Sequence, residues 1–160
     1  MTRAELGLVI MVLLSTPVAA ARLDDSLSPL PRVSVNPDWA HEVNTGLGSD
    51  AFNALVARIS GFEVRLNTAV YVGKTVQIYL GLPVHILGLR SPGGMRIEWQ
   101  TRGLFASSST APGLRSLIFQ GIVTSPILSE VFDFTVHIDA RQMDRELQFD
   151  PVFEIEILRP

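Results

Sequence analysis

Apolar and polar residues alternate in several short runs of this 160-residue chain. In the clearest run, 62–72, the even positions are apolar or threonine and the odd positions are mostly polar. Successive side chains of a strand point to opposite faces of a sheet, so a period of two predicts a strand buried on one face. The same period predicts further strands over 76–80, 95–101, 131–139 and 153–157.

Turn and loop residues separate these runs. Gly73 and Lys74 follow the first run and predict a two-residue hairpin turn to the next strand. The serine-rich segment 106–113 ends in Pro-Gly and predicts a loop. The run 117–123 is mostly apolar, which predicts a central strand buried on both faces. A short strand over 147–149 is expected to start the last hairpin.

A different spacing precedes the first long strand. The positions i, i+3, i+4 and i+7 of one helical face are occupied by Phe52, Leu55, Val56 and Ile59. Gly61 follows, and a left-handed glycine commonly stands just beyond the end of a helix. The pattern therefore predicts one short helix over 50–59.

Together these elements predict a mainly β fold. We expect an antiparallel, immunoglobulin-like β-sandwich of seven or eight strands, with the short helix before the first long strand. The phrase VGKTVQI at 72–78 resembles phrases common in bacterial immunoglobulin-like and related sandwich domains. This resemblance implies a sandwich and assigns no functional residue.

The first 21 residues have the three parts of a secretory signal peptide. Arg3 precedes an apolar block over 6–14, and small residues follow up to Ala21. The block is about half of the roughly 20 residues that a membrane-spanning helix needs, which disfavours the alternative of an uncleaved anchor. We expect cleavage after Ala20 or Ala21 and a periplasmic or secreted location.

Beyond the signal peptide we expect a tail and one domain. Three prolines with several Asp and Ser residues over 22–37 predict an extended, solvated segment. Residues 38–160 are then a single β-sandwich domain. The chain has no cysteine, so burial alone must hold this domain together. No later segment approaches about 18 apolar residues, so we expect no transmembrane helix in the mature chain.

Charge narrows the classes of partner. The net charge is −3, which disfavours nucleic acid as a ligand. Residues 90–115 contain four arginines and one glutamate, whereas 130–156 contain eight acids and two arginines. Two explanations are open: cross-strand ion pairs, or a docking surface with opposite poles for a protein partner or for self-assembly. Arg96 and Arg102 are the interaction candidates on the basic side.

One strand carries the strongest candidate chemistry. Asp133, Thr135, His137 and Asp139 share a face of the predicted strand 131–139. His137 and Asp139 are candidates for two ligands of a metal of unknown identity, or for an acid–base pair.

Further ligands would have to come from elsewhere in the chain. His85 is one candidate, and the remaining contributors considered are His41, Glu98 and Glu130. The alternative is a solvated outer face of an antiparallel sheet, which we favour.

These features favour a non-catalytic protein. No Gly-x-Ser-x-Gly motif, thiol or phosphate-binding glycine loop occurs. We therefore expect an exported binding or assembly module with no cofactor, in which Trp39 covers one end of the sandwich or binds a partner. The alternatives are a metal- or ligand-dependent enzyme that uses the face with His137, and a small outer-membrane barrel.

Overall fold

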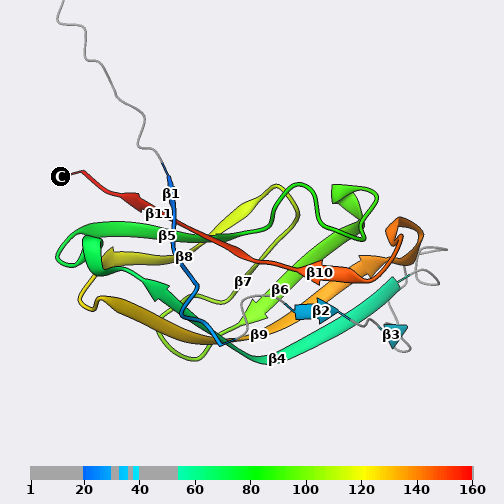
Figure 1. Ribbon diagram of the computed structural model, residues 1–160, viewed down its shortest axis with the longest axis horizontal. Coiled ribbons are helices and arrows are strands. Elements are labelled where there is room, and N and C mark those ends of the chain that lie inside the picture. Colours follow the sequence, from blue (N-terminus) through cyan, green and yellow to red (C-terminus); the bar gives the residue numbers. More distant parts are fainter. Residues whose placement is uncertain (1–19, 30–32, 36–37, 40–53, 160) are drawn as a thin grey trace, which may run out of the picture.

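Two antiparallel sheets face each other (Figure 1), and the apolar residues of the predicted strands form the core. The computed structural model describes residues 20–29, 33–35, 38–39 and 54–159. The two sheets lie one above the other in a sandwich-like arrangement, and the mainly β, antiparallel part of the prediction is confirmed. The immunoglobulin type of the sandwich stays a prediction.

The upper sheet in Figure 1 has four strands. In spatial order they are β1 (Ala21–Arg22), β11 (Val152–Ile157), β5 (Thr75–Gly81) and β8 (Arg115–Ile122).

The lower sheet has five strands. In spatial order they are β3 (Asp38–Trp39), β4 (Ala54–Asn67), β9 (Ile127–Asp139), β6 (Met95–Gln100) and β7 (Ser108–Thr110). A separate two-stranded sheet pairs β10 (Leu147–Phe149) with β2 (Val33–Val35). Short 3-10 turns lie at η2 (Ala69–Tyr71), η3 (Pro92–Gly94) and η4 (Ala140–Gln142).

Aromatic rings fill the space between the sheets. Phe134 on β9 is 1% exposed and lies 4.8 Å from the Phe149 ring and 5.3 Å from the Phe132 ring, centroid to centroid. The Phe132 ring lies 6.0 Å from that of Phe153, which belongs to the opposite sheet. The inward positions predicted by alternation on β5, β6 and β9 are buried, so the core follows the sequence pattern.

The predicted helix over 50–59 is wrong where the structure describes it. Residues 54–59 are the first part of β4, residues 50–53 lie outside the described residues, and no α-helix occurs among those described. Ser60 and Gly61 form a bulge in which two residues face one on β9. The bulge moves the inward-facing positions of β4 from odd to even residue numbers. The period of two is therefore interrupted along the sequence at this point.

Two other predicted features are also wrong. The strands before and after Gly73 belong to different sheets. Gly73 therefore lies in a turn that leads from one sheet to the other, and the two strands do not form a hairpin. The run 117–123 lies largely in β8, which is the edge strand of its sheet. Leu117 and Ile122 on this strand are exposed, in contrast to the expected burial on both faces.

The described parts of the segment 22–37 lie along the sheets. Arg22 pairs with β11, Leu23 is buried, and its N–H donates to the carbonyl of Phe153 at 2.8 Å. Further along, β2 pairs with β10. Between these pairings the chain turns, because the Ser28 N–H donates to the Asp25 carbonyl at 2.9 Å.

Candidate functional site

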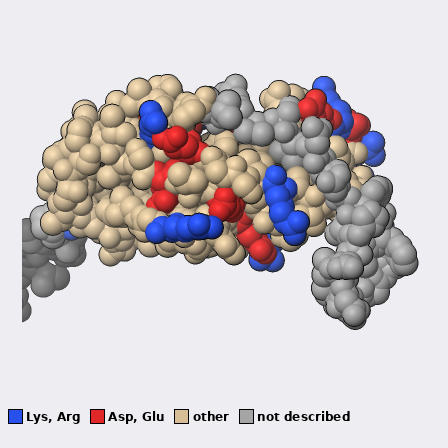
Figure 2. Space-filling model, turned by 90° about the horizontal axis from the view of Figure 1, so that it is seen from below, with Lys and Arg blue, Asp and Glu red and all other residues tan. Residues whose placement is uncertain are grey.

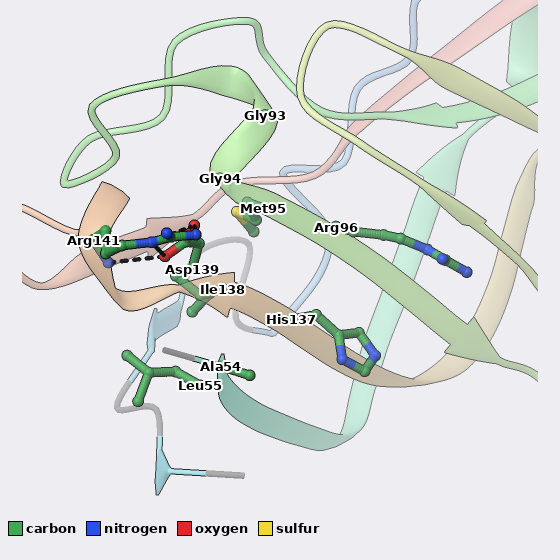
Figure 3. Close-up of a pocket in the computed structure, with 10 residues that line it drawn as sticks. All are labelled: Ala54, Leu55, Gly93, Gly94, Met95, Arg96, His137, Ile138, Asp139 and Arg141. Atoms are coloured by element: carbon green, nitrogen blue, oxygen red, sulfur yellow. Dashed lines mark hydrogen bonds and ion pairs between the residues drawn. The ribbon is translucent and has the colours of Figure 1, made fainter. Parts of the chain in front are cut away.

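A pocket of about 310 Å³ lies at one end of the lower sheet. It is bounded by the start of β4, the start of β6, the end of β9 and the turns η3 and η4. Arg96, His137 and Asp139, three of the residues singled out from sequence, line it together with Arg141 (Figure 3). Strand register explains the convergence, because Arg96 on β6 pairs directly with His137 on β9.

His137 is half-exposed, but its Nε2 atom is shielded from solvent and has no hydrogen-bond partner among the described residues. The nearest acid is Glu98, whose Oε2 lies 3.8 Å from Nε2. The other carboxylate oxygen of Glu98 accepts from Arg96 Nη2 at 2.8 Å. Glu98, and not Asp139, is therefore the carboxylate beside the imidazole.

Asp139 is held by Arg141. Its carboxylate accepts from Arg141 Nε at 2.9 Å, from Nη2 at 2.7 Å and from the backbone N–H at 3.0 Å. The hydrogen bonds from the Arg141 side chain lower the pKa of Asp139 from its ordinary value. Figure 3 shows this ion pair on one side of the pocket, while His137 and Arg96 extend to the other.

The structure does not assemble a metal site from these residues. No group of three or more His, Cys, Asp or Glu side chains suited to a metal occurs within the described ranges. His85 lines a different pocket, with Asp144 and Arg145, and His41 lies outside the described residues.

Two acids considered from sequence have structural contacts. Asp133 accepts the N–H of Gly61 at 2.8 Å and so satisfies the backbone of the β4 bulge. Glu130 is buried and accepts the N–H of Phe105 at 3.1 Å, which fastens the loop between β6 and β7. Both carboxylates therefore stabilise irregular backbone beside β9.

The two predicted interaction residues on the basic side, Arg96 and Arg102, do not share the pocket. Arg102 is exposed in the loop after β6, whereas Arg96 lines the pocket. The backbone of Trp39 pairs with that of Leu55, another lining residue of the pocket, so β3 runs beside the site.

Ion pairs join the basic and acidic regions of the chain. Arg115 contacts Glu154 at 2.7 Å and Glu156 at 2.6 Å across β5, and its guanidinium lies 4.2 Å from the Tyr79 ring centre. The hydrogen bond to Glu156 raises the pKa of Arg115, and burial together with the Glu156 charge raises that of Tyr79. These contacts fit the explanation of cross-strand pairing.

On the face seen from below in Figure 2, acidic and basic side chains also lie next to one another.

Sequence reasoning missed Arg141. Its signal is the spacing Asp-x-Arg at 139–141. A carboxylate at the start of a 3-10 turn can accept hydrogen bonds from both the backbone N–H and the side chain of the residue two positions later.

Comparison of the chain with protein-family models gave no match, and neither did comparison with curated proteins. No helix among the described residues is long and apolar enough to cross a membrane.

Proposed function

We propose that this chain is an exported, non-catalytic binding module, and that its ligand enters the pocket beside His137. The observation that carries the proposal is that Arg96 on β6 lines one pocket with His137 and Asp139, which lie far from it in sequence on β9. Ligand sites combine an apolar lining with a few convergent polar groups. Met95 and Ile138 supply apolar lining here.

The polar groups favour a small ligand with hydrogen-bond acceptors. A guanidinium offers five donors, and Arg96 uses one nitrogen, Nη2, for the contact with Glu98. The His137 ring offers a further donor or acceptor. A small molecule that joins an oxygen acceptor to an apolar part matches this lining.

The same contacts support a binding role over catalysis. An acid–base pair needs a carboxylate that orients the imidazole, yet the Asp139 carboxylate is held by Arg141. Glu98 lies 3.8 Å from His137 Nε2, longer than a hydrogen bond, and is shared with Arg96. We therefore infer a site that holds its ligand without a cofactor and without a chemical step.

Export is part of the proposal and rests on the signal-peptide pattern. Cleavage after Ala20 keeps β1 complete, whereas cleavage after Ala21 removes its first residue. The test is expression of the whole chain in a bacterium, with osmotic-shock release and intact-mass measurement. Export predicts a released protein that begins at Ala21 or Arg22, and retention of the full mass in the cytoplasm would contradict it.

The immunoglobulin type of the sandwich is also inferred. The crossover from β4 to β5 between sheets supports it, because sandwiches of this type change sheet between consecutive strands. An experimental structure that gave a different strand order would refute this assignment.

The binding site itself is tested by a thermal-shift screen of small organic acids and sugars. A compound at 100 times its Kd stabilises a folded protein by about 2.7 kcal/mol. Compounds that stabilise the wild type should lose this effect in the double variant R96A/H137A and keep it in the control H85A. Equal stabilisation of all three proteins would place the binding outside this pocket.

A further inference from the structure

A second surface lies at the opposite end of the long strands. We call it the apolar tip and define it as residues 68–75 and 121–128. These segments connect β4 to β5 and β8 to β9, at the left end of Figure 1. The pair Thr75–Ile122 ends the pairing of β5 with β8 in one sheet, and Asn67–Ile127 ends that of β4 with β9 in the other.

Apolar side chains of the apolar tip are exposed. Val70 is 72% exposed and Ile122 is 60% exposed. Val72 and Ile127 are also exposed. Four apolar side chains from two separate connections therefore face solvent at one end of the molecule.

Hydrogen bonds fasten the two connections to each other. The Thr68 N–H donates to the Pro126 carbonyl and its hydroxyl donates to the Ser125 carbonyl, both at 2.8 Å. The Gly73 N–H donates to the Val123 carbonyl, and the Val123 N–H donates to that of Lys74. These backbone groups are satisfied internally, which lowers the cost of moving this surface out of water.

The charge of the apolar tip differs from that of the chain. Its sixteen residues contain no acid, although the whole chain has a net charge of −3. Lys74 is the only lysine of the chain, and its Nζ lies 5.7 Å from the centre of the Tyr71 ring. An acid lies at the base of the apolar tip, where Asp24 forms an isolated β-bridge with Asn67.

We propose that the apolar tip inserts into the surface of an anionic lipid bilayer. Exposed aliphatic side chains gain free energy at the boundary of the acyl chains, a tyrosine favours the headgroup level, and a lysine is attracted to anionic lipids. A second copy of the chain fits less well, because stable interfaces use about 20–30 residues on each side and the apolar tip has sixteen.

This surface is independent of the pocket. The strand β9 runs from Ile127 at the apolar tip to Asp139 at the pocket, and its thirteen residues span about 40 Å at 3.3 Å per residue. A bilayer held at the apolar tip therefore leaves the pocket open to solvent, and either proposal can fail without the other.

The absence of cysteine allows a direct test in the whole chain. A single cysteine is introduced as V70C, or as the control L114C at the opposite end of β8, where the native leucine is 63% exposed. Each is labelled with an environment-sensitive NBD dye and mixed with phosphatidylglycerol–phosphatidylcholine vesicles. The proposal predicts a blue shift and brighter emission at position 70 only. Equal responses at both positions, or none at 70, would overturn it.

Vesicle co-sedimentation of unlabelled variants gives the second measurement. V70D should weaken binding about tenfold, since it removes a largely exposed valine from the inserted surface. K74E should weaken it at least about fivefold on anionic vesicles. The control L114D should bind like the wild type. A signal peptide that remained attached would contribute equally to the binding of all variants. Lipid-independent self-association through position 70, seen by sedimentation velocity, would refute the proposal in favour of a dimer.

Discussion

Replacement of Gly61 by alanine tests the bulge that sets the register of β4. Gly61 has φ +69°, in the left-handed region, and no heavy atom would lie within 4 Å of an added Cβ. Any cost is therefore conformational and not steric, and an L-residue with a side chain loses about 1–2 kcal/mol in this region. For a chain of this size that loss lowers Tm by about 2–4 °C for each kcal/mol.

A matched control separates backbone strain from the loss of a glycine. Gly93 also has room for a Cβ, with Ser91 Oγ at 4.0 Å as its nearest contact, and its φ is outside the positive range. G93A should leave the free energy of unfolding unchanged or raise it slightly. Urea unfolding followed by the fluorescence of the buried Trp99 measures both variants. Equal losses in G61A and G93A would refute the assignment of strain to Gly61.

The partner of the bulge gives an independent check. D133A removes the acceptor of the Gly61 N–H and should cost about 1 kcal/mol, whereas D133N keeps an acceptor and should cost less. Hydrogen exchange of the Gly61 amide should be faster in D133A than in the wild type. Unchanged exchange would mean that the Asp133 carboxylate does not protect this amide.

Three further predictions concern β9 and its surroundings. D139N should destabilise the fold at neutral pH. Because the native pKa of Asp139 is lowered, the difference in stability from the wild type should disappear as the pH falls below about 4. Urea titrations at several pH values measure this difference, and a constant difference would contradict the ion pair. F134A should cost roughly 3–5 kcal/mol of stability, because the Phe134 ring packs among four other aromatic rings. The control V131A, on the exposed face of β9, should change stability by less than about 0.5 kcal/mol. Similar losses of the two variants in calorimetry would mean that the strand faces are assigned wrongly. G103A places a Cβ 2.6 Å from the buried Glu130 carboxylate and should lower the free energy of unfolding by about 1–3 kcal/mol. A Tm equal to that of the wild type would contradict this prediction.

The period of two identified the strands that are buried on one face. On β9 and β6 each inward residue of the pattern is buried, because a side chain's face depends only on its parity while the strand is regular. The same rule failed at β4. The bulge at Ser60 and Gly61 changes the parity. Before it, the apolar Val56 lies on the opposite face of the strand from Leu55, and the two residues together fitted a helical spacing.

Pairing between distant segments was not predictable from local patterns. The strand 147–149 pairs with 33–35, and β8 lies at a sheet edge although its sequence is as apolar as that of a central strand. Such pairings depend on the order of strands in space, which periodicity does not contain.

Parity placed His137 and Asp139 on one face of the predicted strand, and in the structure both residues line one pocket. They have different neighbours because Arg141 reaches Asp139 from η4 and Glu98 lies beside His137 on the neighbouring strand β6. A spacing along one strand cannot show which carboxylate a histidine meets across the sheet.

The most direct test of the binding proposal is an NMR titration of the ¹⁵N-labelled chain with the compound that stabilises it most in the thermal-shift screen. The proposal predicts shift changes concentrated at 54–55, 93–96 and 137–141, the segments that surround the pocket. It also predicts that R96A/H137A weakens these changes while H85A preserves them. Shift changes centred on any other surface, with these three segments unaffected, would contradict the account.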